Sequence, residues 1–534
     1  MPNLSVLLVH TAAGDLRLEM PPGRSVREIL DATASRVRAA CGSTGSCGAC
    51  LVTVLHGAAN PPTLAEYRKL TAAERAAGLR LACQLRPAGD MTIRVDHPAA
   101  DSAWRSIAPA DLAAPPAVLA AIQDNVFGVA VDLGTTHLRV SFWDRKRGVR
   151  IASRRGPNLQ ADFGADVLNR LHAAHTDPAH AAELARLARA GIMDAVRDIL
   201  ARDVGEVGPM LAQIGAVVVA GNTAMLALLA GRGVDALLDP ANWQSPIDTT
   251  PHDAAAFQAE WGLPNAAIRL LPPLAGFVGS DLLADLVAMR MGEQRGPELL
   301  LDVGTNSEIA LWDGERLRVT SVPGGPAFEG MGIRHGMAAE PGAIFRVSRA
   351  GDAFECAVVD GGEARGLCGT GLLDAVAVLL ETGDLKPSGR FAMPPGPAGY
   401  LLLPGNERSA VCGADVDAFQ RAKAAAAAAM SQLMDDAGLC WNDLSRLCIC
   451  GAFGRRLDVR HAQATGLLPP VEPDRIELAA EATLAGCEHV LLNEDVLRKI
   501  NDFAGAAHPI NLSFVREYES RYVDHLRLRP MPYR

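Results

Sequence analysis

The stretch Cys41-Gly42-Ser43-Thr44-Gly45-Ser46-Cys47-Gly48-Ala49-Cys50 decides how the first part of this chain folds. Its cysteines have the spacing C-x5-C-x2-C, the residues between them are small, and Cys83 follows after 32 further residues. Four thiolates converging on a tight glycine-rich loop are typical of a [2Fe–2S] cluster, whose sulfides are stabilised by inward backbone N–H groups. A zinc site typically uses paired C-x2-C arms, and this chain has one such pair. We therefore predict that Cys41, Cys47, Cys50 and Cys83 ligate a [2Fe–2S] cluster.

The residues around this loop predict a small mixed α/β domain. Residues 5–9 and 16–19 flank Ala13-Gly14-Asp15 and indicate a β-hairpin. Ser25 and Thr71 each begin an S/T-x-x-E pattern, which is typical of a helix start. A last strand is expected over residues 91–95. This order resembles the β-grasp ferredoxins from about residue 3 to 97, with the longer cluster loop of the adrenodoxin branch, and it implies an electron carrier.

Composition restricts the class of protein. The 534 residues are 49 % hydrophobic and 21 % charged, as in a globular protein, and the net charge of −10 disfavours a nucleic-acid partner. Residues 1–97 carry 11 Lys+Arg and 8 Asp+Glu, a charge of +3, which leaves −13 for the rest. The longest uncharged run, 214–231, is interrupted by Gly221-Asn222-Thr223 and predicts strand–turn–helix, so no membrane partner is expected. No signal peptide is recognisable and the remaining cysteines are scattered, so we expect a cytoplasmic protein.

Two similar turns follow an Ala/Pro-rich stretch, residues 98–125, that is predicted to be a linker. Residues 127–136 form a buried strand ending in D-x-G-T-T, and residues 299–307 repeat the device before a second returning strand. In such a turn successive N–H groups and Thr hydroxyls bind phosphate oxygens, and the Asp organises Mg²⁺ and its waters. The expected phosphate ligands are Gly134, Thr135, Thr136, Gly304, Thr305 and Asn306. The expected Mg²⁺-organising residues are Asp132 and Asp302.

This pair of turns resembles the ASKHA superfamily of ATPases, in which two RNase-H-like halves clamp ATP in the cleft between them. The resemblance implies an α+β β-grasp ferredoxin domain (1–97), the linker, and an α/β ASKHA ATPase domain (126–534). The duplicated halves would be about 126–295 and 296–534. A late strand and turn, residues 447–454, match the adenosine motif through Gly451 and Gly454, with Ala452 where a second glycine is usual. The chain has no G-x-x-x-x-G-K-[ST] pattern, which excludes a P-loop enzyme.

Four further segments narrow the family. They are the Gly-Asn-Thr turn at 221–223, the loop 323–330 with Gly325 and Glu329, the turn 366–374 with Gly369, and an Ala-rich helix from about residue 415. Taken singly, each of these segments is more readily interpreted as a tight turn or a helix cap. Together with the ferredoxin they resemble, over nearly the whole chain, the reductive activators of corrinoid proteins, or RACo-like family.

The resemblance implies an ATP-hydrolysing reductive activase. One electron would pass from the [2Fe–2S] cluster to Co(II) of a corrinoid protein in a methyltransferase system and give Co(I). It also implies ATP and Mg²⁺ as cofactors, a low-potential electron donor (a ferredoxin or a flavoprotein reductase), and a homodimer through the ATPase domain. Glu329 is a candidate for positioning the attacking water, and the alternative is a solvent-facing loop acid.

One departure from the family and three alternatives remain. Longer family members carry a small domain between linker and ATPase, and because the first phosphate loop here follows the linker directly, we expect that domain to be absent.

The alternatives are a redox-gated ATPase acting on a non-corrinoid partner, a small-molecule kinase with a fused ferredoxin domain, and an activator of a radical dehydratase. A kinase needs an acceptor site and a general base, for which no residues can be named. The dehydratase activators bind a cluster through ATPase-domain cysteines, which lack a shared loop pattern here.

Overall fold

The computed structural model describes most of the chain. The described residues are 5–11, 14–31, 33, 35–37, 45, 48, 50–95, 104–107, 125–164, 166–204, 207–304, 306–330, 332–351, 353–451 and 453–533. Two compact units divide it: residues 1–238, 248–272 and 487–497 form one, and residues 239–247, 273–486 and 498–534 form the other. The units exchange short segments, and the predicted halves, about 126–295 and 296–534, stay a prediction.

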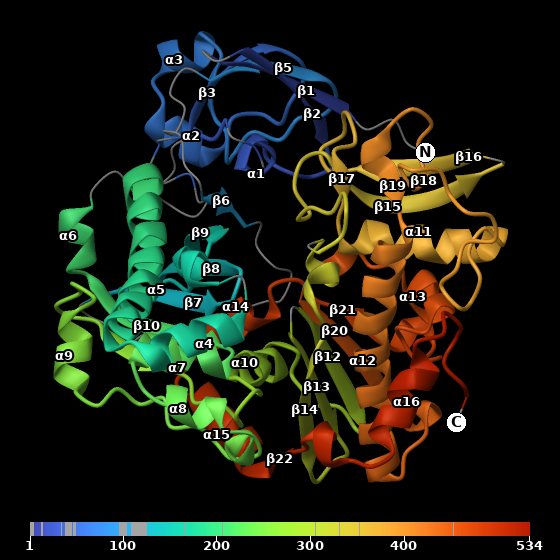
Figure 1. Ribbon diagram of the computed structural model, residues 1–534. Coiled ribbons are helices and arrows are strands. Elements are labelled where there is room, and N and C mark those ends of the chain that lie inside the picture. The colour runs from blue at the N-terminus through green and yellow to red at the C-terminus, as the bar shows by residue number, and fades with distance from the viewer. Residues whose placement is uncertain are drawn as a thin grey trace. The chain divides into compact units, whose positions relative to one another are not determined.

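The N-terminal region is a five-stranded sheet in the order β2-β1-β5-β3-β4, drawn in blue in Figure 1. Its strands are β1 (Ser5–Thr11), β2 (Gly14–Met20), β3 (Leu51–His56), β4 (Leu79–Leu81) and β5 (Met91–Arg94). The predicted hairpin is confirmed, because β1 and β2 pair antiparallel. The helices are α1 (Val26–Asp31), α2 (Leu64–Lys69) and α3 (Ala72–Ala76). Capping boxes are formed at Ser25 and Thr71 as predicted, and a third, from Thr63 to Glu66, begins α2.

A six-stranded sheet forms the centre of the rest of the first unit, in the order β11-β10-β7-β8-β9-β6. Its strands are β6 (Arg105–Ser106), β7 (Phe127–Leu133), β8 (His137–Asp144), β9 (Val149–Pro157), β10 (Ile214–Gly221) and β11 (Ala267–Leu270). The first three long strands form an antiparallel meander, and β10 and β11 continue it in parallel. The edge strand β6 comes from the stretch expected to be a linker. The predicted strand–turn–helix at 214–231 is confirmed as β10 followed by α7 (Thr223–Ala230).

The second unit repeats this arrangement, with the order β21-β20-β12-β13-β14-β22. Its strands are β12 (Glu298–Val303), β13 (Asn306–Trp312), β14 (Leu317–Pro323), β20 (Arg446–Gly451), β21 (Ile476–Leu478) and β22 (Ala507–Pro509). In both sheets the first, second and third long strands form the meander, and the fourth and fifth pair parallel beyond the first. The duplicated RNase-H-like fold is thus confirmed.

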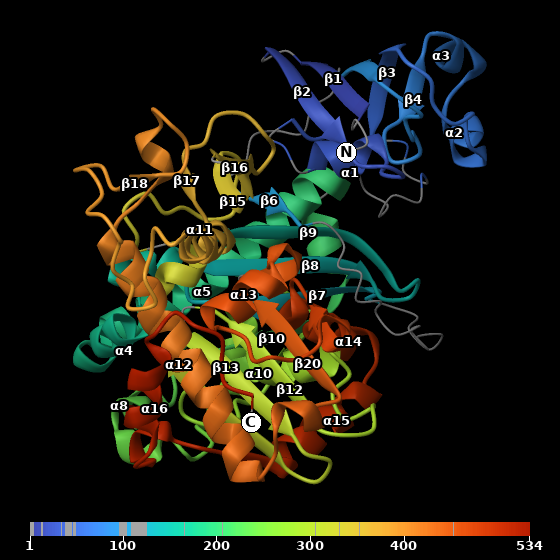
Figure 2. The same cartoon turned by 90° about the vertical axis from the view of Figure 1, so that its right-hand side faces the viewer.

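Helices cover the second sheet, and Figure 2 shows α12 (Gly413–Ala437) beside β13. This 25-residue helix also packs along α16 (Tyr518–His525), and most of its alanines are buried. A small sheet has the order β16-β15-β17, with β15 (Ala343–Ala350), β16 (Ala353–Val358) and β17 (Gly366–Leu367). Helix α11 (Gly369–Thr382) packs on β15. The other long helices of the chain are α4 (Val167–Thr176), α5 (Pro178–Ile199), α10 (Ser280–Ala288), α14 (Ala482–Leu492) and α15 (Asp495–Ala506). Among the described residues, no helix combines the length and the apolar character needed to cross a membrane.

Candidate cluster and nucleotide site

Two of the four predicted cluster ligands are described, and they lie side by side. Cys50 and Cys83 are 1 % and 2 % exposed, and a hydrogen bond between their thiols, together with burial, raises the pKa of Cys50 strongly. Two buried thiols in contact ionise only when a positive charge compensates them. The two iron ions of a cluster would supply that charge. Cys41 and Cys47 lie outside the described residues, and their ligation stays a prediction.

The glycines of the loop fit a backbone wrapped tightly around such a group. Gly45 and Gly48 adopt φ values of +78° and +74°, which side-chain-bearing residues rarely adopt. A Cβ on Gly45 would lie 2.7 Å from the Cβ of Ala65, and one on Gly48 would lie 3.4 Å from Lys69 Cδ. Helix α2 therefore rests directly on the loop. The buried thiol pair and this loop geometry are what a [2Fe–2S] cluster requires.

An ion pair fixes α2 beside the second buried ligand. Glu66 is fully buried, and it accepts hydrogen bonds from Arg80 Nε at 2.7 Å and from the Leu81 backbone N–H at 3.0 Å. Burial opposes ionisation of Glu66, but the bonds from Arg80, Thr63 and Leu81 outweigh it and lower the pKa of this carboxyl. Because Leu81 is two residues before Cys83, this contact links the helix to the ligand strand.

The first phosphate loop follows β7. Asp132 is 7 % exposed, and its Oδ2 pairs with Arg139 Nη1 of β8 at 2.8 Å. The turn is closed by the Gly134 N–H, which donates to the His137 carbonyl at 3.1 Å. Thr135 is buried, and Thr136 is half-buried at the start of the returning strand. Asp132 therefore lies near the end of β7, and Gly134, Thr135 and Thr136 lie in the tight turn before β8.

Three residues distant in sequence support this turn, and sequence reasoning missed their roles. Asn222, which caps α7, donates from Nδ2 to the Thr135 hydroxyl at 2.9 Å. Arg170 Nη1 of α4 donates to the Thr135 carbonyl at 2.8 Å, and Asn158 Nδ2 donates to the Gly134 carbonyl at 2.9 Å. The Gly-Asn-Thr pattern after a buried strand was the available signal for Asn222. The loop is thus held from three elements.

His137 beside this turn is neutral at physiological pH. Burial, helped by the nearby Arg155 and Arg139, lowers its pKa to about 4. The ring therefore adds no positive charge at the first loop under these conditions.

The second phosphate loop follows β12 in the equivalent place. Asp302 is half-buried in β12 and Asn306 begins β13, whereas Thr305 lies outside the described residues. A Cβ on Gly451, at the end of β20, would lie 2.2 Å from Asp302 Oδ1, and one on Gly324 would lie 2.9 Å from the Gly304 carbonyl oxygen. The adenosine turn and the loop after β14 therefore both touch the second phosphate loop.

A buried acid lies opposite Asp302 in the hairpin. Glu308 is its cross-strand neighbour and is 3 % exposed. Burial and the charges of Asp281 and Asp302 raise the pKa of Glu308 well above its usual range. The raised pKa favours the protonated form of Glu308 beside Asp302. Sequence reasoning missed Glu308, although the hairpin register that follows the D-x-G-T turn indicates it.

The remaining predicted residues lie on segments that meet at Phe328. They are Gly325, Glu329, Gly369 and Gly454. Glu329 is half-buried at the end of the short 3-10 turn Pro326–Glu329, directly after Gly325. A Cβ on Gly369, at the start of α11, would lie 1.9 Å from the Phe328 carbonyl oxygen. The Phe328 ring packs on Phe453, beside Gly454, with 5.0 Å between centroids. Contacts at Phe328 thus connect three segments: the loop 323–330, the start of α11 and the predicted adenosine turn.

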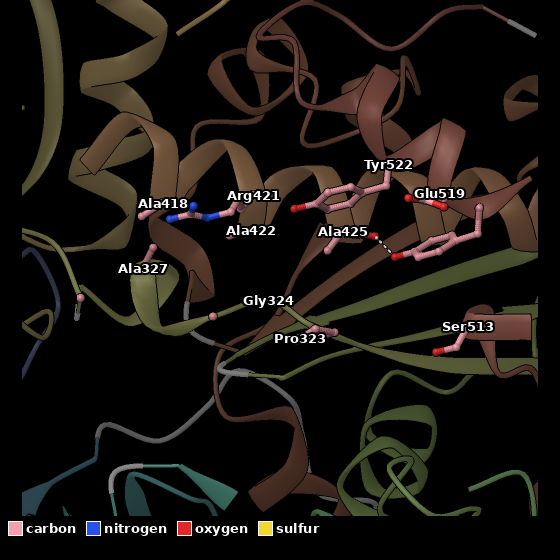
Figure 3. A pocket seen from close by; sticks show the side chains of 13 residues that line it. Pro323, Gly324, Ala327, Ala418, Arg421, Ala422, Ala425, Ser513, Glu519 and Tyr522 are labelled. Atoms are coloured by element: carbon pink, nitrogen blue, oxygen red, sulfur yellow. Dashed lines mark hydrogen bonds between the residues drawn. The ribbon is translucent and has the colours of Figure 1, made fainter. Parts of the chain in front are cut away.

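A pocket of about 690 Å³ is lined in part by the loop 323–330 (Figure 3). Gly324 and Gly325 form one wall, and helix α12 forms another with Arg421 and small alanines. In Figure 3 the Tyr522 ring of α16 points over the pocket, and a dashed line marks the bond from the Tyr518 hydroxyl to the Ala425 carbonyl, 3.5 Å long. The pocket therefore borders the second phosphate loop through Gly324.

No group of three or more His, Cys, Asp or Glu side chains within the described part of the chain is arranged to hold a metal ion. The carboxylates of Asp132 and Asp302 are nevertheless of the oxygen-donor type that Mg²⁺ prefers, and each stands at a phosphate loop. Mg²⁺ bound together with phosphate oxygens needs only one or two such carboxylates. The residues present fit that arrangement.

Comparison with known families divides the chain into three matched regions. A 2Fe–2S iron–sulfur cluster binding domain matches residues 11–88, the RACo middle region matches residues 127–294, and the C-terminal domain of RACo, the ASKHA domain, matches residues 296–532. The expectation that the family's middle region is absent is therefore wrong. Residues 127–294, interpreted above as the first RNase-H-like half, are that region.

Individual relatives agree. The chain is 28 % identical over 399 residues to a corrinoid activation enzyme RamQ of Eubacterium limosum, a match covering 70 % of this chain and 65 % of that protein. It is 29 % identical over 381 residues to a [Co(II) methylated amine-specific corrinoid protein] reductase of Methanosarcina barkeri, covering 64 % and 66 %. The chain thus spans slightly less than two thirds of the length of these relatives.

A solved structure of a reductive activator for a corrinoid, iron–sulfur protein superposes with a TM-score of 0.65, at 24 % identity and 98 % coverage of both chains. At this identity the likeness concerns the fold, and it extends over the ferredoxin sheet and both RNase-H-like sheets. The matched regions, taken in this order, show that the chain belongs to the RACo-like family, in which a [2Fe–2S] ferredoxin is fused to an ASKHA ATPase.

Proposed function

We propose that this protein is an ATP-hydrolysing reductive activase that passes one electron to the Co(II) of a corrinoid protein and returns it to Co(I). The observation that carries the proposal is the combination in one chain of a buried cysteine pair under a glycine-rich loop and two phosphate loops at equivalent places in duplicated sheets. The functions for which the two relatives are named, corrinoid activation and corrinoid reduction, support it.

The ferredoxin region carries the electron. A bound [2Fe–2S] cluster supplies one electron at low potential, near about −400 mV for the plant-type centres. Cys41, Cys47, Cys50 and Cys83 hold it in this proposal, and α2 excludes water from one side of the loop. The hydrogen bond from Gln84 Nε2 to Cys83 Sγ, 3.6 Å long, adds a donor to one ligand sulfur, and donors to the sulfurs are one means of tuning the potential of such a cluster.

The ATPase region binds the nucleotide through its two loops. Gly134, Thr135 and Thr136 hold phosphate oxygens in the first loop, and Gly304, Thr305 and Asn306 do so in the second. The carboxylates of Asp132 and Asp302 orient Mg²⁺ and its waters, and Gly325, Gly369, Gly451 and Gly454 let the backbone approach the nucleotide closely. Glu329 positions the attacking water.

ATP is needed because the electron transfer is uphill. Each ~59 mV of unfavourable potential makes a one-electron transfer about tenfold less favourable. A coupling free energy of about 1–3 kcal/mol, typical of allosteric proteins, offsets roughly one to two such steps. The proposal therefore assigns the electron to the ferredoxin region and the driving force to nucleotide binding and hydrolysis.

The partners follow from this assignment. They are a corrinoid protein of a methyltransferase system, a low-potential donor such as a ferredoxin or a flavoprotein reductase, and a second copy of this chain through the ATPase domain. A reducing cytoplasm suits a protein whose other cysteines are scattered singly.

The test follows cobalt reduction in a candidate corrinoid protein by visible absorbance under anaerobic conditions. Dithionite-reduced protein is compared with and without ATP, as Cys50→Ser, and as Cys440→Ser, a control at an exposed cysteine outside the predicted cluster. We expect Co(I) to form only with ATP and only in wild type and Cys440→Ser. ATP hydrolysis without cobalt reduction across several corrinoid proteins would refute the proposal in favour of a redox-gated ATPase.

A further inference from the structure

Helix α2 presents an unusual surface above the cluster loop. Leu64 is 77 % exposed and Tyr67 is 58 % exposed, although both are large apolar side chains. Arg68 and Lys69 of the same helix are exposed, and Arg75 of α3 lies beside them. We call these five residues the docking face. Aromatic and arginine side chains of this kind are enriched where protein interfaces gain most of their affinity.

The docking face is next to the predicted cluster. Its helix is the one that touches the cluster loop, through Ala65 at the Cβ position of Gly45 and Lys69 at that of Gly48. A protein seated on the docking face therefore contacts the same helix that packs against the cluster loop.

The docking face exposes positive charges to solvent, whereas the acid of its helix, Glu66, is buried. Segment 61–78 contains two acidic residues, and both are engaged elsewhere. Glu66 is buried in its ion pair with Arg80, and Glu74 accepts the capping-box hydrogen bonds of Thr71. Among the described residues, Arg68 and Lys69 take part in no ion pair, whereas Arg75 lies close enough to Glu74 for their charges to attract.

The face is also held in shape before a partner arrives. The Arg75 guanidinium lies over the Tyr67 ring, 4.4 Å from its centroid, and donates a hydrogen bond to the Leu70 carbonyl. A stacked arginine on a fixed aromatic ring loses little conformational freedom on binding. The apolar centre and its cationic rim are thus preorganised.

We propose that the docking face receives the protein that reduces the cluster, and that this donor is an acidic one-electron carrier with an apolar patch at its contact surface. The proposal rests on the proposed function, which requires a reductant. A face of five residues suits the small contact areas of transient electron-transfer complexes. Opposite charges accelerate such short encounters.

The electron transfer is simple to balance with a flavodoxin as the donor. Its flavin hydroquinone loses one electron and becomes the semiquinone, and the oxidised cluster gains that electron. No covalent bond forms or breaks. An acidic flavodoxin is therefore the probe for the test.

The experiment measures the dissociation constant between flavodoxin and the full-length, cluster-loaded protein by calorimetry, and the rate of cluster bleaching by stopped flow. Arg68→Glu is compared with Arg17→Glu, which makes the same charge change at an exposed residue of β2, on the opposite edge of the ferredoxin sheet. We expect Arg68→Glu to weaken binding about tenfold at about 50 mM salt, and much less at about 0.5 M salt, where charges are screened. Arg17→Glu should stay within about twofold of wild type.

A second variant tests the apolar centre. Leu64→Ser should weaken flavodoxin binding at both salt concentrations, because its contribution is not electrostatic. An unchanged visible spectrum of the cluster shows that each variant is intact. If Arg17→Glu weakens binding as much as Arg68→Glu, or if flavodoxin does not bind wild type, the proposal is wrong.

Dithionite separates this proposal from the proposed function. Dithionite needs no docking face, so Arg68→Glu should retain wild-type rates of dithionite-driven, ATP-dependent cobalt reduction. If the variant slows that reaction and binds flavodoxin normally, the face belongs to the corrinoid protein and the donor assignment is overturned. If wild type with dithionite reduces no cobalt, the proposed function fails while the flavodoxin result still decides what the face binds.

Discussion

Replacing Lys423 by methionine is expected to stabilise the second unit. Lys423 lies in α12 with no exposed surface, and its Nζ donates to the Arg527 carbonyl at 2.7 Å. Burial, with a smaller effect of Arg529, lowers the pKa of this amine from an ordinary 10.5 to about 7. The unfolded chain thus holds a proton at pH 7 that half of the folded molecules release, and this costs stability.

The expected magnitude follows from the change in pKa. A fall from 10.5 to about 7 corresponds to about 5 kcal/mol when the group is charged in both states. At pH 7 the cost is about 4 kcal/mol, and loss of the hydrogen bond to the carbonyl offsets about 1 kcal/mol of the gain. We therefore expect Lys423→Met to raise the free energy of unfolding by about 3 kcal/mol at pH 7. Methionine is suitable because it is unbranched and of similar length.

The sign of the pH dependence provides a second check. A lysine whose pKa is lowered by folding destabilises the protein most below pH 7, and the penalty disappears as pH rises toward 10.5. The advantage of Lys423→Met should therefore be largest at pH 6.5 and small at pH 10. Urea unfolding read out by pulsed hydrogen exchange of α12 peptides measures this locally.

Lys386→Met is the control, because Lys386 is exposed. It should change the unfolding free energy little at any pH. A Lys423→Met protein that is less stable than wild type at pH 6.5 would refute the reasoning, since the hydrogen bond would then outweigh the cost of burial. An advantage independent of pH would also refute it, because the amine would then not titrate in this range.

Other substitutions test the phosphate loops and their packing. Asn222→Asp keeps the cap of α7 but removes the amide donor to the first loop, so we expect ATP to bind about fivefold more weakly, as measured by calorimetry. An unchanged affinity for ATP would contradict the role of Asn222. Glu308→Gln should raise the melting temperature more at pH 8 than at pH 5. Folding raises the pKa of this carboxyl, so the wild-type protein becomes less stable as pH increases, and glutamine removes that cost. Equal effects at both pH values would contradict the raised pKa. Gly369→Ala should lower the free energy of unfolding by about 2–3 kcal/mol, whereas Gly413→Ala, at the first position of α12 with open space around it, should not lower it; similar results for the two would argue against the close approach at Gly369.

Local patterns were sufficient for much of the fold. The hairpin at the start of the chain, the D-x-G-T turns after buried strands and the long helix from residue 413 each follow from residues close together in sequence. The capping box at Thr63 follows the same T-x-x-E pattern as the one at Thr71, and it was missed although the signal was present. The duplicated strand order followed from recognising the repeated turns.

Contacts between distant segments could not be derived in this way. Arg170 and Asn158 reach the first phosphate loop from α4 and from the end of β9, and neither belongs to a motif. The raised pKa of Glu308 in β13 depends on burial and on the nearby charges of Asp281 in α10 and of Asp302. The low pKa of Lys423 requires the C-terminal segment to cover α12. Side-chain environments of this kind are determined by tertiary packing and have no local sequence pattern.

The close backbone contacts around Phe328 also affect how evolutionary variation in this family should be interpreted. Added Cβ atoms at Gly330, Gly369 and Gly371 would lie 1.9, 1.9 and 2.0 Å from backbone carbonyl oxygens. Natural selection should therefore retain glycine at these positions in every descendant that keeps the fold, whether or not it retains ATP hydrolysis. Invariance at these three positions would report the close approach of two backbone segments of the same chain. Among relatives that have changed activity, variation at Thr135 or Asn222 is the more informative sign of lost nucleotide chemistry.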